Sequence, residues 1–136
     1  MSGVPYFVMR AGGRTLLLVD DDQDLRELIA CHLSRTGLQV RLAASGEEAI
    51  ELACRDPPDA ILLDGRMPGM DGLTTLRELR ARPQTVAVPV VLMTAGLARG
   101  DLEAALTAGC AGVIAKPFDA RTLATQLRQL VPELEG

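Results

Sequence analysis

The chain has 136 residues, of which 48% are hydrophobic, and a formal net charge of −4. This length suits one domain with a buried core. No apolar run approaches the roughly 20 residues that span a bilayer, no secretory signal opens the chain, and no basic cluster favours nucleic acid. A cytoplasmic domain that binds neither membrane nor nucleic acid by itself is therefore expected.

Residues 1–13 are predicted to form an N-terminal arm, residues 14–132 a single folded domain, and residues 133–136 a C-terminal tail. The arm contains Tyr6 and Phe7, two of the three aromatic residues of the chain. Three alternatives stay open for it, because apolar side chains are unfavourable in water: a disordered tail, a segment docked on the domain, and a contact in a homodimer.

Short apolar runs alternate with helical patterns along the domain. Strands are predicted at 15–19, 38–42, 60–63, 89–93 and 112–115, and the helices between and after them end near Gly37, Pro57, Pro83, Gly109 and Pro132. Such alternation predicts an α/β protein with a parallel sheet and helices on both faces. The second strand is apolar on one side only and belongs at an edge, whereas the first, third and fourth belong inside. With right-handed crossovers, this predicts a flavodoxin-like, doubly wound five-stranded sheet in the order 2-1-3-4-5 with five helices.

Cys31, Cys54 and Cys110 are an odd number at wide spacing, which argues against a disulfide framework or a zinc site. All three fall in helical patterns, which predicts reduced, buried thiols. His32, the only histidine, lies on the apolar stripe of a helix and is expected in the core or at its boundary.

Four of the predicted strands end on polar residues. The first runs into Asp20 and Asp21, the third ends on Asp64, the fourth on Thr94 and the fifth on Lys116. In the order 2-1-3-4-5 these strands are neighbours, and ligands bind beyond the carboxyl ends of such strands. A lone Asp at this place could merely cap a turn, but a carboxylate cluster with an open face suits Mg²⁺. A metal, an ammonium and a hydroxyl together form a receptor for a phosphoryl group.

Four fragments carry a resemblance to a family: Leu-Val-Asp-Asp-Asp at 18–22, Leu-Asp-Gly-Arg-Met-Pro-Gly-Met-Asp-Gly at 63–72, Met-Thr-Ala at 93–95 and Lys-Pro-Phe at 116–118. From residue 16 to about residue 130 the chain resembles the receiver domain of bacterial two-component response regulators. The order and spacing of the fragments, each at a strand end, make the resemblance specific.

The resemblance implies that Asp64 is a nucleophile that takes a phosphoryl group from histidine. It implies that Asp21, Asp64 and the backbone carbonyl of Arg66 bind Mg²⁺ directly, and that Asp20 holds it through water. Such a domain catalyses its own phosphorylation and dephosphorylation, and its partners are a sensor histidine kinase or phosphotransfer protein and a downstream effector or output domain.

The resemblance also implies that Thr94 hydrogen-bonds one phosphoryl oxygen and that Lys116 pairs with another. Ala95 is the small residue that leaves phosphoryl donors a clear approach. The family usually has Tyr or Phe three residues before the lysine, where this chain has Val113. We therefore expect switching to depend on Thr94 and the loop after it more than on rotation of an aromatic ring.

Three other functions are weighed against this one. A phosphohydrolase of the haloacid dehalogenase type needs a second Asp two residues after its nucleophile, where this chain has Arg66, and carries that nucleophile on the first strand. A flavodoxin-like cofactor binder needs a phosphate-cradling loop after the first strand, but residues 20–24 are Asp-Asp-Asp-Gln-Asp, which would repel a phosphate. A receiver that acts only as a phosphorylation-independent scaffold remains an alternative, and whether the chain stands alone or belongs to a longer regulator is left open.

Overall fold

The computed structural model describes residues 13–95, 99–116 and 118–135, so the expectations for the arm fall outside it except at Gly13. The elements in chain order are β1 (Thr15–Val19), α2 (Gln23–Ser34), β2 (Gln39–Ala43), α3 (Gly46–Arg55), β3 (Ala60–Asp64), α4 (Gly72–Arg80), β4 (Val90–Thr94), α5 (Arg99–Thr107), β5 (Gly112–Ala115), α6 (Ala120–Leu130) and the 3₁₀ helix η1 (Pro132–Glu135).

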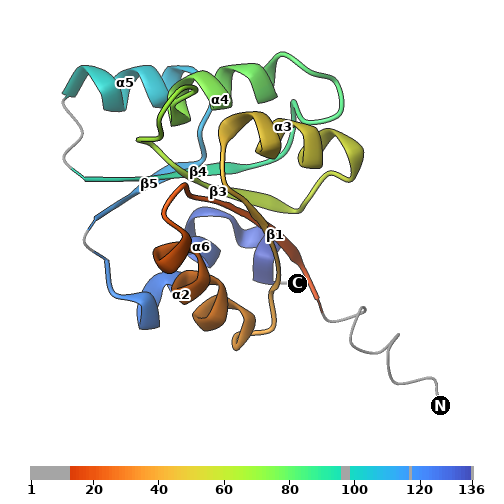
Figure 1. Ribbon diagram of the computed structural model, residues 1–136, viewed down its shortest axis with the longest axis vertical. Coiled ribbons are helices and arrows are strands. Elements are labelled where there is room, and N and C mark those ends of the chain that lie inside the picture. Colours follow the sequence, from red (N-terminus) through yellow and green to blue (C-terminus); the bar gives the residue numbers. More distant parts are fainter. Residues whose placement is uncertain (1–12, 96–98, 117, 136) are drawn as a thin grey trace.

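The five strands form one parallel sheet in the order β2-β1-β3-β4-β5, which confirms the predicted fold. In Figure 1 the sheet lies between two layers, with α3, α4 and α5 on one face and α2 and α6 on the other. The register pairs Val19 with Leu63, Asp64 with Met93, and Thr94 with Ala115. The carboxyl ends of β1, β3, β4 and β5 therefore meet at one edge.

Alternate residues of each central strand enter two separate cores, as the two-residue period of a strand requires. Leu16 and Leu18 pack with α2 and α6, whereas Leu17 and Val19 pack with α3 and α4. Because both faces are covered, these strands are apolar throughout.

Side chains in the loops after the strands begin the helices. Asp22 accepts a hydrogen bond from the amide of Leu25 at the start of α2, and Asp71 accepts one from the amide of Thr74 at the start of α4, at 2.8 Å. Such caps each stabilise a helix by about 1 kcal/mol. Asp22, the third carboxylate after β1, thus acts as a helix cap.

The first residue of α4 lies directly against the end of β3. A Cβ at Gly72 would be 2.6 Å from the carbonyl oxygen of Asp64 and 2.7 Å from the Cα of Gly65. Only glycine permits this approach, which holds the backbone after Asp64 against α4.

Several apolar residues expected in the core are exposed. Leu28 of α2 and Leu106 of α5 are 52% and 53% exposed, and Leu42 and Leu102 are also exposed. In α5 the only fully packed member of the predicted stripe is Ala105. These residues follow the helical or strand period but are not covered by neighbouring elements.

The prediction for the cysteines was wrong in two respects. Cys31 is exposed and Cys54 and Cys110 are half-buried, so none is fully buried. Cys110 lies between α5 and β5 and not within a helix. His32 is half-buried at the boundary of the core, as expected.

Packed structure continues past the expected boundary at residue 132. Within η1, Leu134 is only 2% exposed and belongs to the core on the α2 and α6 side. Arg128 of α6 donates hydrogen bonds to the carbonyl oxygens of Thr36, at 2.9 Å, and Leu134, at 3.4 Å, and its guanidinium lies 3.7 Å from Glu135. The guanidinium thus joins η1 to the residues after α2.

No helix in the described part of the chain is long and apolar enough to cross a membrane.

Replacing Leu134 with Ala is expected to lower the free energy of unfolding by about 2–4 kcal/mol, because a buried leucine leaves a cavity when truncated. Urea denaturation followed by circular dichroism measures this. Glu133→Ala, at an exposed neighbour in the same short helix, is the control and should change stability by less than about 0.5 kcal/mol. Equal effects of the two substitutions would show that η1 does not contribute to the core.

Candidate functional site

Backbone hydrogen bonds carry the sheet just past the ends of its strands. The amide of Gly65 donates a hydrogen bond to the carbonyl oxygen of Met93 at 2.8 Å. The amide of Lys116 donates one to the carbonyl oxygen of Thr94 at 2.9 Å. The ends of β3, β4 and β5 are therefore held in fixed register where the polar side chains begin.

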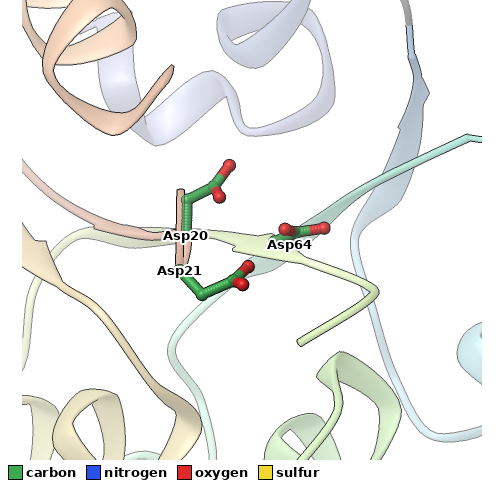
Figure 2. A group of neighbouring side chains, drawn as sticks. All are labelled: Asp20, Asp21 and Asp64. Atoms are coloured by element: carbon green, nitrogen blue, oxygen red, sulfur yellow. The ribbon is translucent and has the colours of Figure 1, made fainter. Parts of the chain in front are cut away.

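Three carboxylates come together at this edge. Asp20, Asp21 and Asp64 each offer an oxygen, and these oxygens all lie within 4.8 Å of one another. Figure 2 shows the three side chains, two following β1 and one at the end of β3. Asp20 is 0% and Asp64 4% exposed, whereas Asp21 is exposed to solvent. The cluster thus has a buried base and an open side.

Lys116 is the counter-charge for the two buried carboxylates. Its Nζ lies 3.3 Å from Oδ1 of Asp64 and 3.9 Å from Oδ2 of Asp20, and its side chain is 22% exposed. One ammonium thus contacts two of the three carboxylates, which leaves the cluster with an excess of negative charge at neutral pH.

Asp20 is held rigidly but incompletely paired. Its Oδ1 accepts a hydrogen bond from the amide of Asp22 at 2.9 Å, and its backbone carbonyl accepts one from the guanidinium of Arg26 at 2.6 Å. Its Oδ2 is buried and has no hydrogen-bond partner among the described residues. Burial, with smaller contributions from Asp64 and Asp21, raises the pKa of Asp20 to about 6, although the amide of Asp22 and the ammonium of Lys116 oppose the rise.

These features fit a small divalent cation. A buried carboxylate oxygen without a donor, beside two more carboxylates, is unfavourable unless a positive charge approaches it. Oxygen ligands with an open, solvated side are what Mg²⁺ requires. The amide of Arg66 donates to Oδ1 of Asp64 at 3.1 Å, so the backbone of Arg66 adjoins the cluster. That its carbonyl is a metal ligand remains a prediction.

The three residues expected to take part in switching lie along β4 and β5. Thr94 is buried at the end of β4, and Ala95 after it is exposed. Val113 of β5 is paired in register with Leu92 and packs, half-buried, against the core on the α3, α4 and α5 side. Thr94 and Ala95 are therefore at the carboxyl edge of the sheet, whereas Val113 lies two residues further back, and the roles of all three in switching stay predictions.

Beside Thr94 lies a cavity of about 190 Å³ that no residue pattern had indicated. Its walls are Gly65, Thr94, the apolar side chains of Leu73, Leu92 and Ala105, and three charged residues, Arg66, Asp71 and Asp101. The one signal in the sequence is Gly65 itself, because a residue without a side chain directly after Asp64 leaves space unfilled.

The comparisons with known proteins agree on one family. The model of the response regulator receiver domain matches residues 16–128. The receiver domain of the sensor histidine kinase PA1611 from Pseudomonas aeruginosa, solved with a magnesium ion in its active-site cleft, is 37% identical, with a TM-score of 0.79 and coverage of 88% of this chain and 98% of that one. The Vibrio cholerae chemotaxis protein CheY4 is 28% identical with a TM-score of 0.81, covering 86% of this chain and 98% of that one. The chain belongs to the response regulator receiver domain family of two-component systems.

Two curated relatives are longer than this chain. The transcriptional regulatory protein GltR of Pseudomonas aeruginosa is 34% identical over 123 residues, which are 90% of this chain and 51% of GltR. The response regulator PleD of Caulobacter vibrioides is 41% identical over 115 residues, which are 85% of this chain and 25% of PleD. The matched region is thus about half of one relative and a quarter of the other.

The raised pKa of Asp20 predicts a pH dependence of stability in metal-free buffer. Between the ordinary pKa of 3.8 and the folded value of about 6, the folded state binds more protons at Asp20 than the unfolded state does. Asp20 therefore contributes up to about 3 kcal/mol to the free energy of unfolding below pH 4, and this contribution is lost as the pH rises through 6.

Asp20→Asn removes this titration. In EDTA, the stability of Asp20→Asn relative to the parent should increase from pH 4 to pH 7, as measured by urea denaturation at each pH. Asp56→Asn, at a side chain that is 81% exposed, is the control and should show no such trend. A stability difference that stays constant across this range would contradict a raised pKa at Asp20.

Proposed function

We propose that this domain is a phosphoacceptor in a two-component phosphorelay, in which Asp64 receives a phosphoryl group from a phosphohistidine in an Mg²⁺-dependent reaction. The observation that carries the proposal is the environment of Asp64. Its carboxylate is buried at the sheet edge, 3.3 Å from the Lys116 ammonium and beside the carboxylates of Asp20 and Asp21. Of the two buried carboxylates, Asp64 lies nearer to the Lys116 ammonium, at 3.3 Å against 3.9 Å for Asp20.

The proposed step is a displacement at phosphorus. A carboxylate oxygen of Asp64 forms the new O–P bond, the N–P bond of the phosphohistidine breaks, and its electron pair returns to the imidazole, which takes up a proton from solvent. The product at Asp64 is an acyl phosphate. Because such transfer needs little covalent assistance, positioning and charge neutralisation are the main tasks of the surrounding residues.

Asp20, Asp21 and Asp64, together with the backbone carbonyl of Arg66, would hold Mg²⁺. When bound, the ion neutralises the carboxylates and the negative charge of the incoming phosphoryl oxygens. The excess of three carboxylates over one ammonium supports this assignment, as does Oδ2 of Asp20, which accepts no hydrogen bond from any described residue. The magnesium ion in the active-site cleft of the PA1611 receiver supports it from a relative.

Lys116 would pair with one phosphoryl oxygen and Thr94 would donate a hydrogen bond to another. Lys116 already lies against Oδ1 of Asp64, so a group added to that carboxylate comes within its reach. Thr94 lies on the neighbouring strand, one residue beyond the partner of Asp64. The small side chain of Ala95 leaves the approach of the donor open, and Val113 contributes no aromatic ring to the switch.

The partners follow from the chemistry. The donor would be a sensor histidine kinase or a phosphotransfer protein, and the receiver of the signal an effector or an output domain. GltR is named a transcriptional regulatory protein and matches this chain over half of its length, which supports an output outside the matched region. Hydrolysis of the acyl phosphate by the same site would end the signal.

Phosphorylation is expected at one residue only. Acetyl phosphate or a phosphorylated histidine kinase, with Mg²⁺, should add a single phosphoryl group, and Asp64→Asn should abolish the adduct because an amide cannot act as the nucleophile. Intact-mass spectrometry measures it, with the exposed Asp56→Asn as a variant that should be modified like the parent. An adduct that persists in Asp64→Asn, or forms equally well in EDTA, would contradict the assignment.

Lys116 is expected to act on the phosphorylated state more than on the fold. With Mg²⁺ present, Lys116→Ala should melt near the parent but bind beryllofluoride, a stand-in for the phosphoryl group, at least about tenfold more weakly, since a charge-assisted contact is lost. Titration followed by amide chemical shifts measures this affinity. Arg121→Ala removes an exposed cation from α6 and should bind like the parent. Unchanged affinity in Lys116→Ala would exclude the proposed contact.

A further inference from the structure

The residue after the proposed phosphoacceptor is a glycine whose missing side chain would face Thr94. A Cβ at Gly65 would lie 3.1 Å from the Cβ of Thr94 and 3.3 Å from its Oγ1. Both distances are shorter than ordinary van der Waals contact. A methyl group at this position would therefore crowd the Thr94 side chain where it now lies.

The backbone of Gly65 cannot easily move away from such a contact. Its amide donates to the carbonyl oxygen of Met93 at 2.8 Å, and its own carbonyl accepts from the amide of Gly72 at 3.2 Å. Gly72 in turn packs against the backbone of Asp64 and Gly65, where no Cβ would fit. Any adjustment must therefore come from Thr94.

The cavity of about 190 Å³ adjoins Thr94 on the face of the sheet that α4 and α5 cover. The strand positions explain which face this is. Leu63 and Leu92 belong to the core covered by α3, α4 and α5, and Gly65 and Thr94 are two residues further along the same strands. Since side chains alternate, Asp64 directs its carboxylate to the other side, towards Lys116. To bond a phosphoryl group on Asp64, the Thr94 hydroxyl must leave its present position beside Gly65.

We propose that Gly65 is a positioning residue that stabilises the resting position of Thr94 by leaving space for it, and so sets the affinity of the site for a phosphoryl group. The proposal rests on the proposed function of Asp64 and adds that the residue at position 65 influences how strongly the site binds a phosphoryl group. A side chain at position 65 raises the free energy of the resting position of Thr94. This increase is relieved when Thr94 moves to the phosphoryl group. The equilibrium then shifts towards the binding-competent state, and the apparent affinity for a phosphoryl mimic increases.

The test is titration of the parent and of Gly65→Ala with beryllofluoride at saturating Mg²⁺, followed by amide chemical shifts. Gly65→Ala should bind about threefold more tightly, because relief of a short contact changes the population of a minor state by a modest factor. Its affinity for Mg²⁺ alone should equal that of the parent, since the three atoms nearest to the added methyl group, outside its chain neighbours, belong to Thr94 and Met93. Gly65→Ser, which adds the same Cβ, is the second variant if Gly65→Ala does not give a cooperative thermal melt.

A double-mutant cycle shows whether the effect passes through Thr94. In a Thr94→Ala background no hydroxyl is available to bond the mimic, so adding Gly65→Ala should leave the affinity unchanged. The same increase in both backgrounds, or unchanged or weaker binding in the single Gly65 variants, would overturn the proposal. If the parent binds no beryllofluoride, the proposed function itself fails. If the parent binds but the Gly65 variants bind equally well, only the role of Gly65 fails.

Discussion

The proximity of buried carboxylates at the end of a parallel sheet is the constraint on which the rest of the site depends. Asp20 and Asp64 are removed from water, adjoin exposed Asp21, and share a single ammonium from Lys116. Burial makes the charged form of Asp20 unfavourable and raises its pKa to about 6. Such a cluster favours the approach of a cation and, in the proposed function, of a phosphoryl group through that cation.

The scaffold holds this unfavourable arrangement because the strand ends cannot move apart. Parallel pairing fixes β1, β3, β4 and β5 in register, and two apolar cores hold the helices against both faces of the sheet. The close packing of Gly72 on the backbone of Asp64 ties α4 to the same edge. The repulsion between the carboxylates is thus offset by the burial of apolar side chains elsewhere in the domain. Such an arrangement is common where function requires like charges close together.

The two sides of the sheet edge have different tasks. On one side, Lys116 and the carboxylates form the charged site, and on the other, Thr94 adjoins a cavity and a half-buried valine. Gly65 lies where the two meet, directly after Asp64 in the chain and against Thr94 in space. The proposed chemistry at Asp64 and the proposed movement of Thr94 are therefore coupled by two adjacent residues of β3 and the loop after it.

Most of the fold could be predicted from the sequence, because strands that are apolar throughout and a strand that is apolar on one side specify their places in a sheet. The polar residues at the strand ends, Asp20, Asp64, Thr94 and Lys116, were likewise identified from their position after apolar runs. Periodicity was less reliable at the surface. Leu28 and Leu106 match a helical stripe but are exposed, because a stripe shows which residues could be buried and not how far the neighbouring elements extend.

The sequence by itself determined the order of the strands and the set of charged groups at their ends, since both follow from local patterns and from the handedness of the crossovers. Only the tertiary structure decided how those groups share their charges: Lys116 lies against Asp64, Oδ2 of Asp20 accepts no hydrogen bond in the described part of the chain, and Asp22 turns away to cap α2. It also decided that Leu134 is buried and that a cavity lies beside Thr94. These features depend on distances between segments far apart in the chain, which no local pattern encodes.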